Sequence, residues 1–258
     1  HRCRADLHSG VGTGNGEVVC VDTLTGEVRW RFVSNGPIAE APIVADTLVI
    51  FANETDRVTA LDALTGEFKW QYKNETGSAD SLLRGHAGLA ADDQFVYTGF
   101  SNATVVALRI ASGSVSWSSR LSVKQPKYVD VDSTPVLLGN RIYVASGAGG
   151  VFALDRTTGL TVWSQALGDK DGVGLSELTT DGTNLYVSAA TDGVFALDLD
   201  GNVLWQHAVA GGGDPSMPRQ FLARAGDLGG VEIFRVWFER RFIERTQVAR
   251  EFLEIARE

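Results

Sequence analysis

Five copies of one short pattern limit most strongly how this chain can fold. Each copy is an apolar run that usually ends in Ala-Leu-Asp, then a turn with glycine, then a segment that ends in tryptophan. Successive tryptophans are 40, 47, 46 and 42 residues apart, a period typical of repeat architectures in which neighbouring units bury each other's faces. The glycine precedes the tryptophan by four residues in every copy: Gly26 and Trp30, Gly66 and Trp70, Gly113 and Trp117, Gly159 and Trp163, Gly201 and Trp205.

Each copy predicts a β-hairpin. The glycine supplies the positive φ that such a turn needs, and the preceding aspartate can accept hydrogen bonds from the turn backbone. Two further short strands precede the later hairpins, at 134–138 and 141–145 in the fourth copy and at 177–180 and 184–188 in the fifth. Four antiparallel strands per unit predict an all-β chain that forms β-propeller blades, with each tryptophan packed between neighbouring blades.

The composition agrees with a turn-rich β structure and excludes several classes of protein. The chain has 29 glycines and one methionine, and 44% of its 258 residues are hydrophobic, which is enough to bury a core. The formal net charge of −9 argues against a nucleic-acid partner, because phosphate binding needs a basic face. No apolar run is long enough for a transmembrane helix. Cys3 and Cys20 form neither a haem-attachment motif nor a zinc ribbon, and a disulfide or two thiols both fit the sequence.

The motifs that usually carry chemistry are missing or incomplete. The glycine-rich run 10–16 precedes a predicted strand and is therefore interpreted as a hairpin turn, not as a phosphate-binding loop. The segments 169–172 and 198–201 resemble half of a calcium loop but lack the closing glutamate, and the second is the repeat turn itself. The four histidines lack metal-ligand spacing, and no nucleophile elbow occurs. The sequence therefore predicts no catalytic residue, no metal site, no cofactor and no enzymatic activity.

The C-terminal segment departs from the repeat. We divide the chain into propeller blades at 1–218 and an off-pattern tail at 219–258, which holds eight arginines and no lysine. Apolar residues at helical spacing predict an amphipathic helix in this tail. We favour an alternative explanation, in which the tail is not native to the propeller and arises, for example, from a frameshift or an error at the gene end. The opening residues 1–8 allow the same interpretation.

The pattern Ala-Leu-Asp-x-x-Thr-Gly-x-x-x-Trp resembles the PQQ-type propeller repeat over residues 11–218. That family includes quinoprotein dehydrogenases and outer-membrane assembly lipoproteins of the BamB type, with rings of about eight blades. Five blades at most are visible here, the first of them expected to be incomplete. The chain is most similar to the BamB type, which implies a periplasmic, non-catalytic scaffold at the outer membrane of a Gram-negative bacterium, although Cys3 is not preceded by a lipobox.

Two other functions stay open at this point. A PQQ-type repeat also occurs in binding or sensor modules of other roles, and the fold alone does not decide between them. A quinoprotein dehydrogenase fragment, which would use PQQ and calcium, is the less favoured alternative because the chain has no vicinal cysteines.

Two segments suggest a partner-binding patch. The offset of 46 residues between the third and fourth copies relates Arg84 to Asp130, so that opposite charges occupy equivalent positions on neighbouring blades. Segments 81–85 and 129–135 look like the BamB segments that contact the periplasmic domains of the barrel insertase BamA. The resemblance implies contacts to that insertase, and also to unfolded outer-membrane proteins. An inter-blade ion pair worth about 0–1 kcal/mol is the alternative. The predicted patch consists of Leu82, Leu83, Arg84, Asp130 and Asp132.

Overall fold

The structure, a computed structural model, describes residues 2–3, 8–12, 14–74, 87–121, 131, 133–146, 150–167, 175–189 and 193–207. These residues form five four-stranded antiparallel sheets, and no helix occurs among them. The predicted all-β propeller architecture is therefore confirmed. The tail at 219–258, with its predicted helix, lies outside the described residues.

The strands of each sheet follow one another in chain order, so that every blade is a simple meander. Blade 1 contains β1 (Arg2–Cys3), β2 (His8–Gly12), β3 (Glu17–Asp22) and β4 (Val28–Val33). Blade 2 contains β5 (Ile43–Ala45), β6 (Leu48–Asn53), β7 (Arg57–Asp62) and β8 (Phe68–Lys73). Blade 3 contains β9 (Ala90–Ala91), β10 (Phe95–Gly99), β11 (Thr104–Arg109) and β12 (Val115–Arg120). Blade 4 contains β13 (Val136–Leu138), β14 (Arg141–Ser146), β15 (Gly150–Asp155) and β16 (Thr161–Gln165). Blade 5 contains β17 (Leu175–Thr180), β18 (Asn184–Ala189), β19 (Gly193–Asp198) and β20 (Val203–His207).

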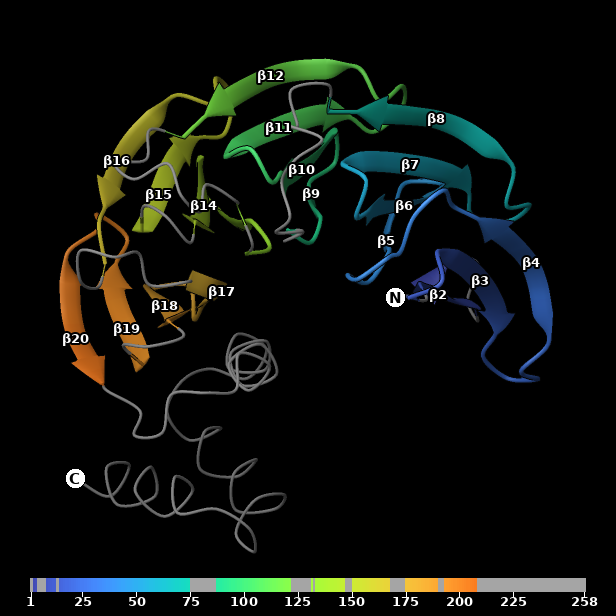
Figure 1. The fold of residues 1–258 in the computed structure, drawn as a ribbon, viewed down its shortest axis with the longest axis horizontal. Coiled ribbons are helices and arrows are strands. Elements are labelled where there is room, and N and C mark those ends of the chain that lie inside the picture. Colours follow the sequence, from blue (N-terminus) through green and yellow to red (C-terminus); the bar gives the residue numbers. More distant parts are fainter. Residues whose placement is uncertain are drawn as a thin grey trace, which may run out of the picture.

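The blades lie side by side along an open arc, with the fourth strand of each blade on the outer side (Figure 1). Blade 1 and blade 5 lie at the two ends of this arc. The expectation of an incomplete first blade is wrong, because β1 pairs with β2 through Arg2 with Ser9 and Cys3 with His8. This strand is only two residues long, too short to show a strand pattern in the sequence.

A row of three residues crosses the middle of each blade. In blade 3, Tyr97 of β10 pairs with Ala107 of β11, which pairs with Trp117 of β12. The small alanine leaves room above it, so the tyrosine and tryptophan rings on either side approach to 6.0 Å between centroids. A β-bulge follows this central residue in all five blades, and in blade 3 it lies between Ala107 and Leu108.

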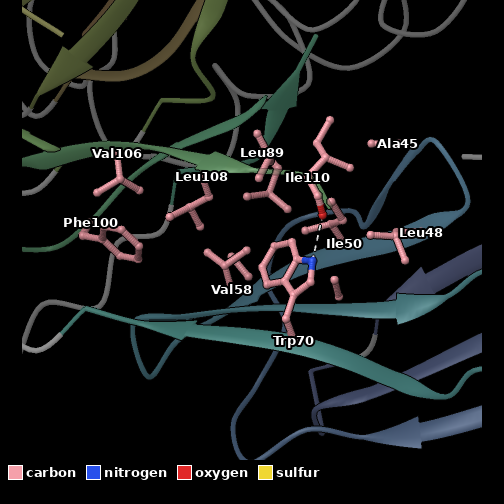
Figure 2. Close-up of a cluster of buried hydrophobic side chains, with 13 residues drawn as sticks. Ala45, Leu48, Ile50, Val58, Trp70, Leu89, Phe100, Val106, Leu108 and Ile110 are labelled. Carbon is pink, nitrogen blue, oxygen red and sulfur yellow. Dashed lines mark hydrogen bonds between the residues drawn. The ribbon is translucent and has the colours of Figure 1, made fainter. Parts of the chain in front are cut away.

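Among the described residues the hydrophobic core is divided into four clusters, one between each pair of neighbouring blades. Figure 2 shows the cluster between blades 2 and 3, where Trp70, Ile50 and Val58 meet Leu108 and Ile110. We call the side of a blade that carries the tryptophan its trailing face, and the opposite side its leading face. Each cluster joins the trailing face of one blade to the leading face of the next, so that no blade buries its apolar surface alone.

In blades 1 to 4 the tryptophan reaches the β-hairpin turn between the third and fourth strands of the next blade. The indole Nε1 atoms donate hydrogen bonds to four turn carbonyls: Trp30 to Ala63 at 3.1 Å, Trp70 to Ile110 at 2.7 Å, Trp117 to Arg156 at 3.0 Å and Trp163 to Leu199 at 3.1 Å. The ring also covers the turn glycine, and a Cβ added to Gly66 would lie 2.7 Å from an indole carbon of Trp30. Since Gly66 also has a φ of 74°, this position excludes a side chain for two reasons.

Candidate partner-binding site

The five residues of the predicted patch lie outside the described residues. Leu82, Leu83 and Arg84 belong to the link from β8 to β9, and Asp130 and Asp132 belong to the link from β12 to β13. Both links connect the outer strand of one blade to the inner strand of the next. The described residues at the ends of the two links show how these segments are anchored.

The two links end next to each other. Ala87 is 1% exposed, and the Thr98 hydroxyl donates to the carbonyls of Ala87 and Gly88 at 3.3 Å each. Gly88 also lies directly against Thr134, because a Cβ added to Gly88 would clash with the Thr134 side chain. Thr134 belongs to the second link, so a close glycine–threonine contact joins the ends of the two segments that carry the predicted patch.

The second link is fixed on both sides of Asp132. Val131 is fully buried, forms a β-bridge with Ser146, and donates its N–H to the carbonyl of Phe100 at 3.3 Å. The buried Ser133 hydroxyl accepts the N–H of Ala145 at 2.7 Å and donates to the Ala145 carbonyl at 3.4 Å. The chain is therefore held against β14 immediately before and after this carboxylate.

The links lie at the same end of the strands as the turns between the second and third strands, as the meander topology requires. Polar side chains cross between blades 2 and 3 at this end. The Ser101 hydroxyl donates to Asp56 Oδ2 at 3.0 Å, and Asn74 Nδ2 donates to Asn102 Oδ1 at 3.2 Å. Asn74 directly precedes the first link and is 5% exposed, so this hydrogen bond anchors the start of the link as well.

The opposite end of the strands carries the repeated aspartate turns. Asp22 Oδ1 accepts the N–H groups of Leu24 and Thr25 at 2.9 and 3.0 Å, and its Oδ2 accepts a hydrogen bond from Arg29 at 2.8 Å. The Arg29 hydrogen bond and these two backbone bonds hold the pKa of Asp22 well below its usual range. Equivalent turns form at Asp62, Asp155 and Asp198, as the sequence predicts. The third copy has Arg109 here, and its guanidinium lies 5.3 Å from the centre of the Phe95 ring.

Two further aspartates, Asp92 and Asp181, close the turns between the first and second strands of blades 3 and 5. Burial alone would raise the pKa of each carboxyl, but hydrogen bonds from backbone N–H groups and a tyrosine hydroxyl together lower it. The hydroxyl of Tyr97 lies 2.8 Å from Asp92, and that of Tyr186 lies 2.7 Å from Asp181. Burial raises the pKa of both tyrosines, and the hydrogen bond to the carboxylate raises it further.

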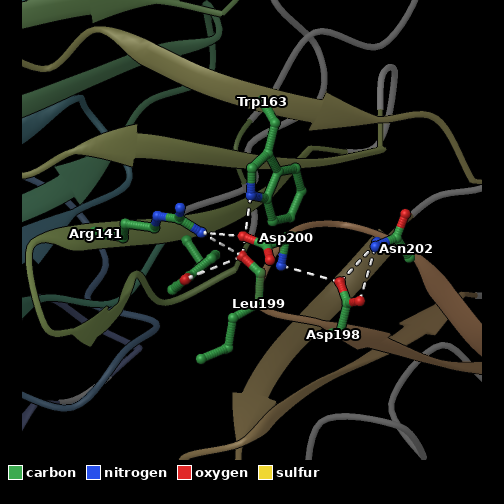
Figure 3. A network of polar contacts seen from close by, with 7 residues as sticks. Arg141, Trp163, Asp198, Leu199, Asp200 and Asn202 are labelled. Carbon is green, nitrogen blue, oxygen red and sulfur yellow. Dashed lines mark hydrogen bonds and ion pairs between the residues drawn. The ribbon is translucent and has the colours of Figure 1, made fainter.

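In blade 4 the equivalent tyrosine, Tyr143, bonds a backbone carbonyl of blade 5 instead of a carboxylate, within a polar network that crosses to blade 5 (Figure 3). The carbonyl of Leu199 accepts hydrogen bonds from Arg141 at 2.6 Å, from Tyr143 at 3.3 Å and from Trp163 at 3.1 Å. Arg141 also pairs with Asp200 at 3.0 Å. One turn carbonyl of blade 5 is thus bound by three side chains of blade 4, which fixes the junction between them.

These carboxylates predict how stability depends on pH. Their pKa values in the folded state are below the unfolded value of about 3.9, so their stabilising contribution is present above about pH 4 and is lost as the pH falls through the lower folded values. We expect the urea midpoint of unfolding to change little between about pH 7 and pH 5 and to fall below about pH 4. Asp62→Asn, which keeps an acceptor oxygen in the turn, should make this fall smaller. An equally steep fall in this variant would contradict the assignment.

No group of three or more histidine, cysteine, aspartate or glutamate side chains that could hold a metal occurs in the described part of the chain. Of the two segments that resemble half of a calcium loop, 169–172 lies outside the described residues. The other, 198–201, is the hairpin turn of blade 5, as predicted, because Asp198 Oδ1 accepts the N–H groups of Asp200 and Asn202 at 2.9 Å. Within the same described residues, no helix is long and apolar enough to span a bilayer.

Comparison with known proteins gives consistent matches. The sequence model of the family described as outer membrane protein assembly factor BamB matches residues 6–143 and 129–225. A relative of that name from Burkholderia pseudomallei is 29% identical over an alignment of 248 residues, which covers 89% of this chain and 62% of the relative. The crystal structure of BamB from Moraxella catarrhalis superposes with a TM-score of 0.66 and 26% identity, over 80% of this chain and 59% of that one.

The quinohemoprotein alcohol dehydrogenase from Comamonas testosteroni has a similar fold, with a TM-score of 0.59 over 69% of this chain and 36% of the dehydrogenase. Its sequence identity is 18%, so this likeness concerns the fold alone. The chain spans less than half of the length of several curated relatives named BamB, with shares of 44%, 38% and 42%.

Proposed function

The chain belongs to the family of the outer membrane protein assembly factor BamB, and on that basis we propose that it is a non-catalytic propeller scaffold that binds the periplasmic domains of a BamA-type barrel insertase. In this role it helps outer-membrane β-barrel proteins to assemble, in the periplasm and at the outer membrane. The match of the family model over residues 6–143 and 129–225 carries the proposal. Unfolded outer-membrane proteins are a second class of partner for such a scaffold.

We place the contact with the insertase at the two links. Arg84 would engage an acidic group of the partner, Asp130 and Asp132 a basic or amide group, and Leu82 and Leu83 would supply apolar area. The anchoring of the links supports this placement. Gly88, four residues after Arg84, lies against Thr134, two residues after Asp132, so the described ends of the two links meet between blades 3 and 4.

A binding titration against the periplasmic domains of a matched BamA tests the proposal. We expect the wild-type chain to bind, and Arg84→Glu and Asp130→Arg each to weaken binding at least tenfold, about 1.4 kcal/mol, because each reversal places like charges together. Asp93→Arg is the matched control. Asp93 is an exposed carboxylate in the turn between β9 and β10, at the opposite end of the strands, so its reversal should leave the affinity unchanged.

The titration separates the function from the patch. Binding that all three variants retain would place the contact elsewhere on the scaffold. A folded wild-type chain that shows no binding would overturn the scaffold function and favour a repeat module with another partner.

A further inference from the structure

Three consecutive residues where β10 ends contact both of the links that carry the predicted patch. The Thr98 hydroxyl lies 3.3 Å from the carbonyl oxygen of Gly88, at the end of the first link. The Phe100 carbonyl accepts the N–H of Val131, in the second link, at 3.3 Å. Gly99 lies directly against the Val131 side chain, because a Cβ added to Gly99 would clash with it. The end of one strand of blade 3 therefore holds both links.

Backbone conformation does not explain the glycine at position 99. Gly99 is a strand residue without a positive φ, and glycine weakens a strand because it has no side chain to pack. The equivalent residues of three other blades are buried and carry a Cβ: Ala52 in blade 2, Ala145 in blade 4 and Ser188 in blade 5. In blade 3 the fully buried Val131 occupies the space that a Cβ would need. Close approach of the second link thus accounts for the glycine.

Gly88 shows the same kind of contact. It also lacks a positive φ, and a Cβ added to it would clash with the hydroxyl oxygen of Thr134. The added Cβ would lie 3.2 Å from Cγ2 and 3.3 Å from Cβ of the same threonine. The equivalent residue of blade 2 is Ala41, so the strand geometry itself permits a side chain at this position. Both glycines therefore leave space for a residue of the second link.

We propose that Gly88 and Gly99 are positioning residues for the insertase contact. Because neither has a side chain, the second link packs against β10 and against the end of the first link, and this packing sets the separation of the two links. Val131 lies directly between the two aspartates of the predicted patch in the sequence, so a shift of Val131 moves these charges. The inference rests on the proposed function and adds residues that act through the links, by fixing them before the partner binds.

The same titration against the periplasmic domains of a matched BamA measures the effect. Gly88→Ala and Gly99→Ala should each weaken binding by about fivefold or more, because the added methyl group displaces the second link. Gly14→Ala is the matched control. Gly14 also lacks a positive φ, and no atom lies within 4 Å of its added Cβ, so its affinity should stay within about twofold of the wild type.

A rescue variant separates positioning from a general loss of stability. Thr134→Ala removes the hydroxyl and Cγ2, which leaves the Cβ of residue 134 at 3.3 Å from a methyl group at position 88. We therefore expect Gly88→Ala with Thr134→Ala to bind within about twofold of Thr134→Ala alone. Two independent losses would add instead, and the double variant would then bind more weakly than either single variant.

A charge-reversed background gives the second separation. In Asp130→Arg, Gly99→Ala should weaken binding by less than about twofold, since the contact that it displaces is already lost. An effect of Gly99→Ala through stability alone would be equally large with and without the reversal, and this result would overturn the positioning role. If Gly99→Ala does not fold, Gly88→Ala and its rescue carry the test.

Hydrogen exchange of the free chain, followed by mass spectrometry, does not depend on the partner. Gly99→Ala should speed exchange in peptides that contain Val131 by about tenfold or more, because the displaced N–H loses its bond to Phe100, whereas Gly14→Ala should not. A wild type that binds, with glycine variants of equal affinity, would overturn the inference and leave the proposed function standing. A folded wild type that does not bind would overturn both.

Discussion

Replacement of Trp70 by alanine should lower the free energy of unfolding by about 3–5 kcal/mol. The indole is 7% exposed and packs between blades 2 and 3, so its removal leaves a cavity in the cluster shown in Figure 2. The variant also loses the hydrogen bond of 2.7 Å to the Ile110 carbonyl, a buried contact for which alanine offers no donor. Urea unfolding followed by far-ultraviolet circular dichroism measures the change.

Trp205→Ala is the matched control for this substitution. Trp205 occupies the same position of the repeat as Trp70, and its ring centroid lies 6.1 Å from that of Tyr186 of its own blade, where blade 2 has Ile50, but it is 47% exposed. We expect a loss of about 1–2 kcal/mol in dilute protein, because only part of the side chain is removed from water. Equal losses in the two variants would show that the contact within the blade, and not the junction between blades, is what tryptophan contributes.

The propeller blades could be predicted from the sequence because the pattern repeats in the residues that the junctions constrain. A turn glycine with positive φ and a tryptophan four residues later recur in all five copies, and the aspartate before the turn recurs in four of them. The turn geometry and the contact with the neighbouring blade require these residue types. Since every blade has the same turn and the same kind of contact, the residues recur along the chain. The third copy has Arg109 instead of this aspartate, so its hairpin lacks the carboxylate that accepts the turn N–H groups. Its strands nevertheless pair as in the other blades.

Other features have no periodic signal. The β-bulge after Ala107 follows from the pairing of Trp117 and Val115 with adjacent residues of β11, which an alternating pattern does not reveal. The contact between Gly88 and Thr134 joins two positions that the offset of 46 residues relates, but the two residue types differ, so no repeated motif marks the contact. The sequence was enough to propose the charged residues of the predicted patch. That the ends of the two links lie side by side could be found only in the structure.

Gly113→Ala should lower the free energy of unfolding by about 2–5 kcal/mol, the sum of two costs. Gly113 has a φ of 68°, a conformation that costs an L-residue roughly 1–2 kcal/mol. The added Cβ would also press into the indole of Trp70, and overpacking of this kind costs about 1–3 kcal/mol. Alanine is smaller than most residues, yet the ring that covers this turn leaves no space even for one methyl group. Urea unfolding of the purified variant measures the sum.

Gly26→Ala separates the two costs. Gly26 has a φ of 74° in the same turn of the repeat, but no described atom lies within 4 Å of the added Cβ, so only the backbone cost of roughly 1–2 kcal/mol should remain. The second test is Gly113→Ala in a Trp70→Ala background, where the ring is absent and the glycine substitution should again cost only the backbone term. If Gly113→Ala lowered the free energy of unfolding as much without the ring as with it, the repeated spacing of glycine and tryptophan within the chain would reflect turn geometry alone. A smaller cost without the ring would show that the four-residue spacing maintains the contact between blades.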